Sequence, residues 1–129
     1  MPLTTSTSVG QAFRPYYDRD GNTISDFEWA KLFSDEEYKI IAKHTQTTQF
    51  AGVTVSTVWL GIDHNFLQEG KPMIFETMVF RNQEGVSLDM DEITYRYSTE
   101  KQALAGHDIC VYNAWRWIRG VPCSWDDID

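Results

Sequence analysis

Two ionisable side chains of this sequence fall at positions that the surrounding pattern predicts to be buried. Glu76 shares a strand face with Ile74, Met78 and Phe80 in the run PMIFETMVF, and His107 lies within the apolar stripe of a helical segment. A buried carboxylate costs several kcal/mol unless it gains a partner or keeps its proton. We therefore expect either a structural hydrogen bond from Glu76 to a His, Arg or Tyr, or a pocket in which Glu76 acts as a general base or metal ligand.

A second pair of polar residues, Asp63 and His64, follows the strongest predicted strand at the mouth of a loop. Together with Glu76 and His107, this pair would supply two imidazoles and a carboxylate, the ligand set of non-haem iron or catalytic zinc. The sequence has no H-x-D, H-E-x-x-H or C-x-x-C spacing, however, and no nucleophile elbow or phosphate-binding glycine loop. We therefore expect no metal and no cofactor, and the chain carries no recognised catalytic motif.

Aromatic residues make up 14% of the chain and include five tryptophans. Three of the aromatic residues, Tyr112, Trp115 and Trp117, gather near the end of the same helical segment, and Trp125 follows in the tail. One interpretation assigns them to the core side and rim of a helix. The other assigns them to a binding surface, because exposed Tyr and Trp are enriched at interfaces. These three aromatic residues, with Asp63 and His64, are the candidate binding residues.

The middle of the chain predicts paired strands. The run from Val53 to Ile62 first alternates and then becomes apolar on both faces, which is typical of a central strand. Met73 to Phe80 predicts the next strand, most simply antiparallel to it, and Glu92 to Tyr97 a further one. Tyr38 to Thr45 alternates as a strand does, with a longer helix from Ser34 as the alternative.

Two capping boxes mark where helices begin. Ser25-x-x-Glu28 opens a short helix, and Thr99-x-x-Gln102 opens the longest one, which extends to about Ile118. The predicted apolar stripe of the long helix comprises Ala103, Leu104, His107, Cys110, Val111, Ala114, Trp115 and Ile118.

At 129 residues the chain predicts one domain, residues 1–129, with flexible tails at 1–11 and 121–129. The expected fold class is α+β: an antiparallel sheet of four to five strands, with a long C-terminal helix packed on one face and a short N-terminal helix. If the long helix covers the sheet face that bears Glu76, then Glu76 and His107 meet.

Composition narrows the classes of partner. The net charge is -8, from 11 basic and 19 acidic residues, which argues against a nucleic-acid partner. No apolar run reaches the length that spans a membrane, and the N-terminus lacks a signal-peptide pattern. Two cysteines, Cys110 and Cys123, fit a reducing compartment, so we expect a cytoplasmic protein.

The run VSTVWLGIDHNF, then GKPMIFETMVF and YSTEKQALAGH, resembles a group of small uncharacterised proteins of actinobacterial phages and prophages. The upstream run DRDGNTISDFEWAKLFSDEEYKII is similar to the same group, so the resemblance spans about Asp18 to Val111. It implies a source, in a phage or a bacterial cytoplasm, and it brings no established activity.

The leading hypothesis is a phage or prophage accessory protein that binds a host protein or a small ligand without catalysis. One alternative is a small hydrolase or metal-dependent enzyme that uses Glu76 with His107 or His64. A second alternative is a structural component of the virion, which predicts an oligomer; the sequence alone leaves the oligomeric state open.

Overall fold

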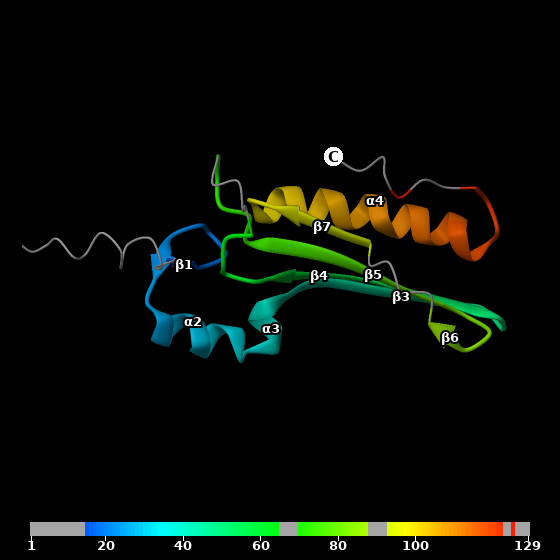
Figure 1. Ribbon diagram of the computed structural model, residues 1–129, viewed down its shortest axis with the longest axis horizontal. Helices are drawn as coiled ribbons and strands as arrows, with labels where there is room; N and C mark the ends of the chain where they lie inside the picture. The colour runs from blue at the N-terminus through cyan, green and yellow to red at the C-terminus, as the bar shows by residue number, and fades with distance from the viewer. Residues whose placement is uncertain (1–14, 65–69, 88–92, 123–124, 126–129) are drawn as a thin grey trace, which may run out of the picture.

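The computed structural model describes residues 15–64, 70–87, 93–122 and 125. Its first part is a small hairpin followed by two short helices, and these elements lie near one end of the main sheet (Figure 1). Ser25 caps the first helix as its capping box predicts, through a bond from the Glu28 amide to the Ser25 hydroxyl. The bounds are β1 Tyr16–Tyr17, β2 Thr23–Ile24, α2 Asp26–Phe33 and α3 Glu36–Lys39.

The main sheet has five strands, all paired antiparallel. Its order runs β3, β4, β5, and both β6 and β7 pair with β5. Each predicted strand of this sheet is present, with its ends shifted by up to three residues. The strand expected from Tyr38 begins at Ile40, because Tyr38 and Lys39 belong to α3. The bounds are β3 Ile40–Thr47, β4 Ala51–Trp59, β5 Phe75–Gln83, β6 Val86–Ser87 and β7 Ile93–Tyr97.

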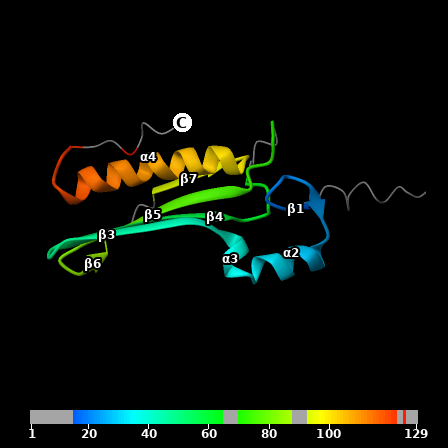
Figure 2. The same ribbon diagram turned by 180° about the vertical axis from the view of Figure 1, so that it is seen from behind.

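The last helix, α4 (Glu100–Ile118), lies along one face of the sheet, as both views show (Figures 1 and 2). Its capping box is complete: the Thr99 hydroxyl accepts from the Gln102 amide, and the Gln102 side chain accepts from the Thr99 amide. The α+β class and the C-terminal helix packed on the sheet are therefore confirmed. The predicted stripe was too wide, since Leu104 and Trp115 are 42% and 44% exposed.

The core between α4 and the sheet consists of two apolar clusters with a polar layer between them. The first cluster comprises Val53, Val55, Val79, Cys110 and Ala114. The second comprises Trp59, Ile74, Phe75, Tyr97 and Ala103. Along β4, β5 and α4 the positions between the two clusters are occupied by Thr57, Thr77 and His107, and all three side chains are buried.

Aromatic packing ties the N-terminal elements to the second cluster. The indole nitrogen of Trp29 donates to the Leu60 carbonyl at 2.9 Å, and that of Trp59 donates to the Tyr17 carbonyl at 3.0 Å. Gly61 adopts a φ of +74°, and a Cβ there would lie 2.6 Å from atoms of both indoles. A side chain at position 61 would therefore separate the two tryptophans.

An ion pair also connects this end to α4. Arg19 donates through Nε and Nη2 to the two carboxylate oxygens of Glu100, at 2.9 and 2.7 Å. The Arg19 guanidinium lowers the pKa of Glu100, which lies in the first turn of α4, where the helix dipole also favours a negative charge. The predicted tails lie mainly outside the described residues.

Candidate functional site

Glu76 lies on the sheet face that α4 leaves open. Along β5, Phe75, Thr77 and Val79 are buried, whereas Glu76 points to the other side with Phe80, which is 41% exposed. Because side chains alternate between the faces of a strand, only one of these two sets can face the helix. The larger buried set does so. The prediction that Glu76 and His107 meet in a pocket is therefore wrong.

Glu76 has a partner on its own face. Arg96, directly opposite on β7, donates from Nε to Glu76 Oε2 at 3.1 Å, and the Glu76 side chain is 12% exposed. This cross-strand ion pair corresponds to the structural Glu–Arg alternative among the sequence-based interpretations. It accounts for a carboxylate among apolar neighbours without a catalytic role.

His107 is enclosed between α4 and the sheet, with 6% of its surface exposed. Its Nδ1 lies 2.7 Å from the Thr57 hydroxyl oxygen, which lies 2.6 Å from the Thr77 hydroxyl oxygen. Burial lowers the pKa of His107; Asp108 opposes this shift and His44 adds to it. Burial therefore disfavours the protonated imidazole. The three bonded side chains form a continuous polar layer, which we call the polar belt: Thr57, Thr77 and His107.

Asp63 and His64 close the loop that joins β4 to β5. The Met73 amide donates to Asp63 Oδ1 at 2.8 Å, and the His64 amide donates to the Met73 carbonyl at 2.8 Å. The Nδ1 atom of His64 lies 2.8 Å from the Ile62 carbonyl oxygen. These bonds hold the two ends of the loop together, which explains the polar pair by structure.

The predicted ligand set is therefore spread over three places: the open sheet face, the polar belt and the loop closure. In the part of the chain that the structure describes, no group of three or more His, Cys, Asp and Glu side chains could hold a metal ion. Cys110 is also buried in the first apolar cluster, and burial raises the pKa of its thiol to about 12. It therefore lacks the thiolate character of a nucleophile.

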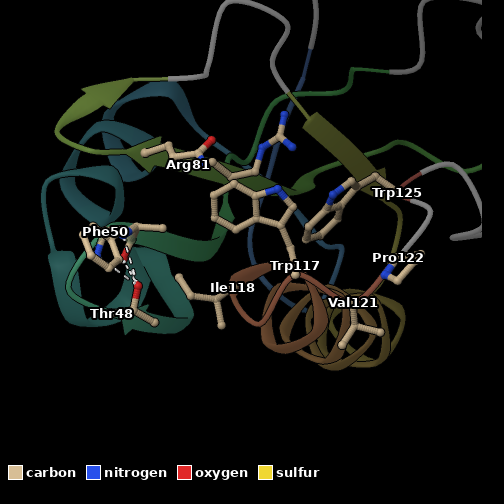
Figure 3. Close-up of a pocket in the computed structure, with 11 residues that line it drawn as sticks. Thr48, Phe50, Arg81, Trp117, Ile118, Val121, Pro122 and Trp125 are labelled. Carbon is tan, nitrogen blue, oxygen red and sulfur yellow. Dashed lines mark hydrogen bonds between the residues drawn. The ribbon is translucent and has the colours of Figure 1, made fainter.

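A hollow lies at the far end of the sheet, where the chain leaves α4 (Figure 3). We call it the aromatic pocket. It has a volume of about 600 Å³ and opens to solvent. The β3–β4 turn, the end of β5 and the end of α4 supply its walls, which are formed by Thr48, Phe50, Ala51, Arg81, Gln83, Trp117, Ile118, Gly120, Val121, Pro122 and Trp125.

Local bonds fix the walls of the aromatic pocket. The Thr48 hydroxyl accepts from the amides of Phe50 and Ala51 at 3.3 and 3.1 Å and so shapes the turn that presents Phe50. On the opposite wall the Arg81 guanidinium lies over the Trp117 ring, 5.6 Å from its centroid. Figure 3 shows the indole of Trp125 beside that of Trp117.

Trp117 is the pocket residue named in the predicted binding set, and Trp125 belongs to the aromatic group from which that set was taken. Phe50 was missed, although it is the single large apolar residue in the Thr- and Gln-rich stretch after β3, and it is 62% exposed. Arg81 was missed because the predicted strand ends at Phe80, whereas β5 continues to Gln83 and carries Arg81.

Tyr112 and Trp115, the other two predicted aromatic residues, lie on the outer face of α4 rather than in the aromatic pocket. They are 58% and 44% exposed. The three aromatic residues are neighbours in the sequence but lie on different faces of α4. Trp117 is turned toward the sheet and packs against the first cluster.

No protein-family model matches this chain, and neither the curated proteins nor the solved structures provide a significant match. None of the helices within the described residues has the length and apolar character needed to cross a membrane.

Proposed function

We propose that this chain is a small cytoplasmic accessory protein of a phage or prophage, which binds a host protein or a small ligand without catalysis. The observation that carries the proposal is the aromatic pocket, where an exposed Phe50 faces a wall of Trp117 and Ile118 across an open hollow of about 600 Å³. The phage source rests on the sequence resemblance alone.

The chemistry of the aromatic pocket indicates what it would accept. Ligand pockets are commonly between 300 and 1,000 Å³ and mostly apolar, with a few polar groups that orient the ligand. Here the aromatic and aliphatic side chains suit a planar or branched apolar group, and Arg81 and Gln83 add polar character to the lining. A hydrophobic side chain of a partner protein, or a small aromatic molecule, fits that description.

The placement of the ionisable residues supports binding over catalysis. Glu76 is paired with Arg96 on one sheet face, and His107 is bonded to Thr57 beneath the other. A general acid–base pair must reach the same reacting group. Residues separated by the sheet cannot do so, and neither of them lines the aromatic pocket.

Capture of partners from an actinobacterial host lysate, quantified by mass spectrometry, tests the proposal. Phe50→Ser removes an exposed wall of the pocket and is expected to abolish enrichment of the partner. Phe27→Ser is a matched control, since Phe27 is 78% exposed on α2, far from the pocket. Glu76→Gln should also keep the partner.

A small-molecule partner is sought by native mass spectrometry of the protein after incubation with the low-molecular-weight fraction of the same lysate. A bound mass that disappears in Phe50→Ser supports the aromatic pocket. Loss of binding in Glu76→Gln, with binding retained in Phe50→Ser, would contradict the proposal and direct attention to the open sheet face.

A further inference from the structure

The outer face of α4 is unusually apolar for a helix that covers a sheet. A surface helix normally carries charged or polar residues on the side away from the core. Here four large apolar side chains on the helix are 42% to 58% exposed, and no described element covers this side of α4 (Figures 1 and 2). They are Leu104, Ile109, Tyr112 and Trp115.

Four residues form a line along this outer face, which we call the crest: Asp108, Tyr112, Trp115 and Arg119. Their spacings of four, three and four residues place them one above another on successive helical turns. The Tyr112 and Trp115 rings are nearly parallel, at 12°, with centroids 6.4 Å apart. The Arg119 guanidinium lies 4.3 Å from the Trp115 centroid and donates to the Trp115 carbonyl.

These contacts hold the crest in one arrangement before any partner arrives. The Arg116 guanidinium also lies over the Tyr112 ring, 5.7 Å from its centroid. Side chains that are ordered in advance lose less conformational entropy on association. Tyr, Trp and Arg are also the residues in which binding energy concentrates at protein interfaces.

Along the crest an acidic residue is followed by two aromatic residues and then a basic residue. A second α4 that lies antiparallel presents the same residues in the reverse order. One register then sets Asp108 against Arg119 of the second copy and Tyr112 against Trp115 of the second copy, and two-fold symmetry repeats both contacts. The crest is thus complementary to itself in charge and in the order of its aromatic residues.

We propose that the crest of α4 is a self-association surface, through which two copies of this chain form a symmetric dimer with their α4 helices antiparallel. The net charge of -8 makes most of the surface repel a second copy. Along the crest, one acidic residue is balanced by Arg119 and the neighbouring Arg116. The four crest residues do not line the aromatic pocket. The proposed dimer therefore does not depend on the function proposed for that pocket.

Sedimentation velocity over a range of protein concentrations tests the dimer directly. The wild-type protein is expected to shift from monomer to dimer as the concentration rises. Trp115→Ala should weaken the association by on the order of tenfold or more, as truncation of a central aromatic residue does at other interfaces. Phe27→Ala, at an exposed aromatic residue on α2, should leave it unchanged.

Charge exchange tests the antiparallel register. Asp108→Arg and Arg119→Asp should each weaken dimerisation, because each places like charges opposite one another. The double variant Asp108→Arg/Arg119→Asp should restore it, because it exchanges both signs at once. Circular dichroism and thermal unfolding of each variant establish that the monomer is still folded.

A protein that stays monomeric at every concentration would overturn the proposal. A dimer that survives Trp115→Ala unchanged, or a double variant that associates no better than the single ones, would overturn it as well. Neither result bears on the aromatic pocket, which is tested by Phe50→Ser.

Discussion

His107 shows how a single residue connects the stability of this fold to pH. Burial lowers the pKa of its imidazole below 6.5, its ordinary value; the charge of Asp108 opposes this shift and His44 adds to it. The unfolded chain therefore binds a proton at pH values where the folded chain does not. Since protons then favour the unfolded state, the free energy of unfolding must fall as the pH falls from neutral.

We expect this loss of stability to begin near pH 6.5, the ordinary pKa of His107, and to level off once the pH is below the lowered pKa of the folded state. Urea denaturation at a series of pH values, kept above the range in which carboxylates titrate, measures it. His107→Gln should flatten the slope, whereas the exposed His44→Gln should retain most of it. An unchanged slope in His107→Gln would show that another group carries the pH dependence.

Glu76 shows what the sequence could and could not predict about a single residue. Its apolar neighbours correctly indicated partial burial, and its pairing with a basic residue was one of the alternatives. The error was to assume which face α4 covers. That choice depends on Thr77 and Thr57, which read as polar and therefore as outward, although their hydroxyls are bonded to each other inside.

At the scale of elements, the contact between α4 and β7 depends on a glycine. Gly106 is buried in the middle of the helix, where Tyr97 of β7 lies across it. A Cβ at position 106 would come within 2.5 Å of Tyr97 Cε1 and Cζ, and closer still to its hydroxyl oxygen. Tyr97 has little freedom to move, because it is 9% exposed and belongs to the second apolar cluster.

Gly106→Ala is therefore expected to destabilise the protein by about 1–3 kcal/mol, as overpacking a buried site does. Helix propensity alone predicts the opposite sign, a gain of about 1 kcal/mol. Ala105→Gly, at an exposed position on the same turn, should cost about 1 kcal/mol through helix propensity alone. It therefore measures the size of the propensity effect in this helix. Urea denaturation measures both variants. A Gly106→Ala variant more stable than the wild type would show that the Tyr97 side chain can move to make room for the added methyl group.

Elements whose signals are local were predictable from the sequence. The helix starts at Ser25 and Thr99 and the alternation along β4 depend on residues near one another in the chain. The structure has the complete capping box at Thr99 and the N-cap bond of Ser25. The aromatic pocket was not predictable. Its walls come from the β3–β4 turn, the end of β5 and the end of α4, and only the tertiary fold brings Phe50 near Trp117.

At the scale of the whole molecule, the interior is divided rather than continuous. One apolar cluster lies toward the aromatic pocket, the other toward the N-terminal hairpin, and the polar belt separates them. Each buried member of the belt depends on the others for its hydrogen bonds. Removing one member leaves a polar group buried without its partner, which is the costly case.

Thr57→Val is accordingly expected to cost about 1–3 kcal/mol, because Nδ1 of His107 and the Thr77 hydroxyl each lose the bond to the Thr57 hydroxyl. Thr54→Val is the matched control on the same strand, where the hydroxyl bonds to Thr45 at an exposed position. It should change the free energy of unfolding by only a few tenths of a kcal/mol, within the usual range of about ±0.5 for surface substitutions.

Replacing the entire polar belt should cost less than breaking it. In Thr57→Val/Thr77→Val/His107→Leu no buried donor or acceptor of the belt remains, and the side chains keep similar volumes, so the two apolar clusters would merge into one. Exchange of a complete buried polar group for apolar residues is often neutral or stabilising. We therefore expect the triple variant to be more stable than Thr57→Val alone, and to lose the pH dependence that His107 confers.

Urea denaturation of the triple variant at neutral and mildly acidic pH measures both effects. If its destabilisation instead equals or exceeds that of Thr57→Val, the polar belt contributes net stability to this fold.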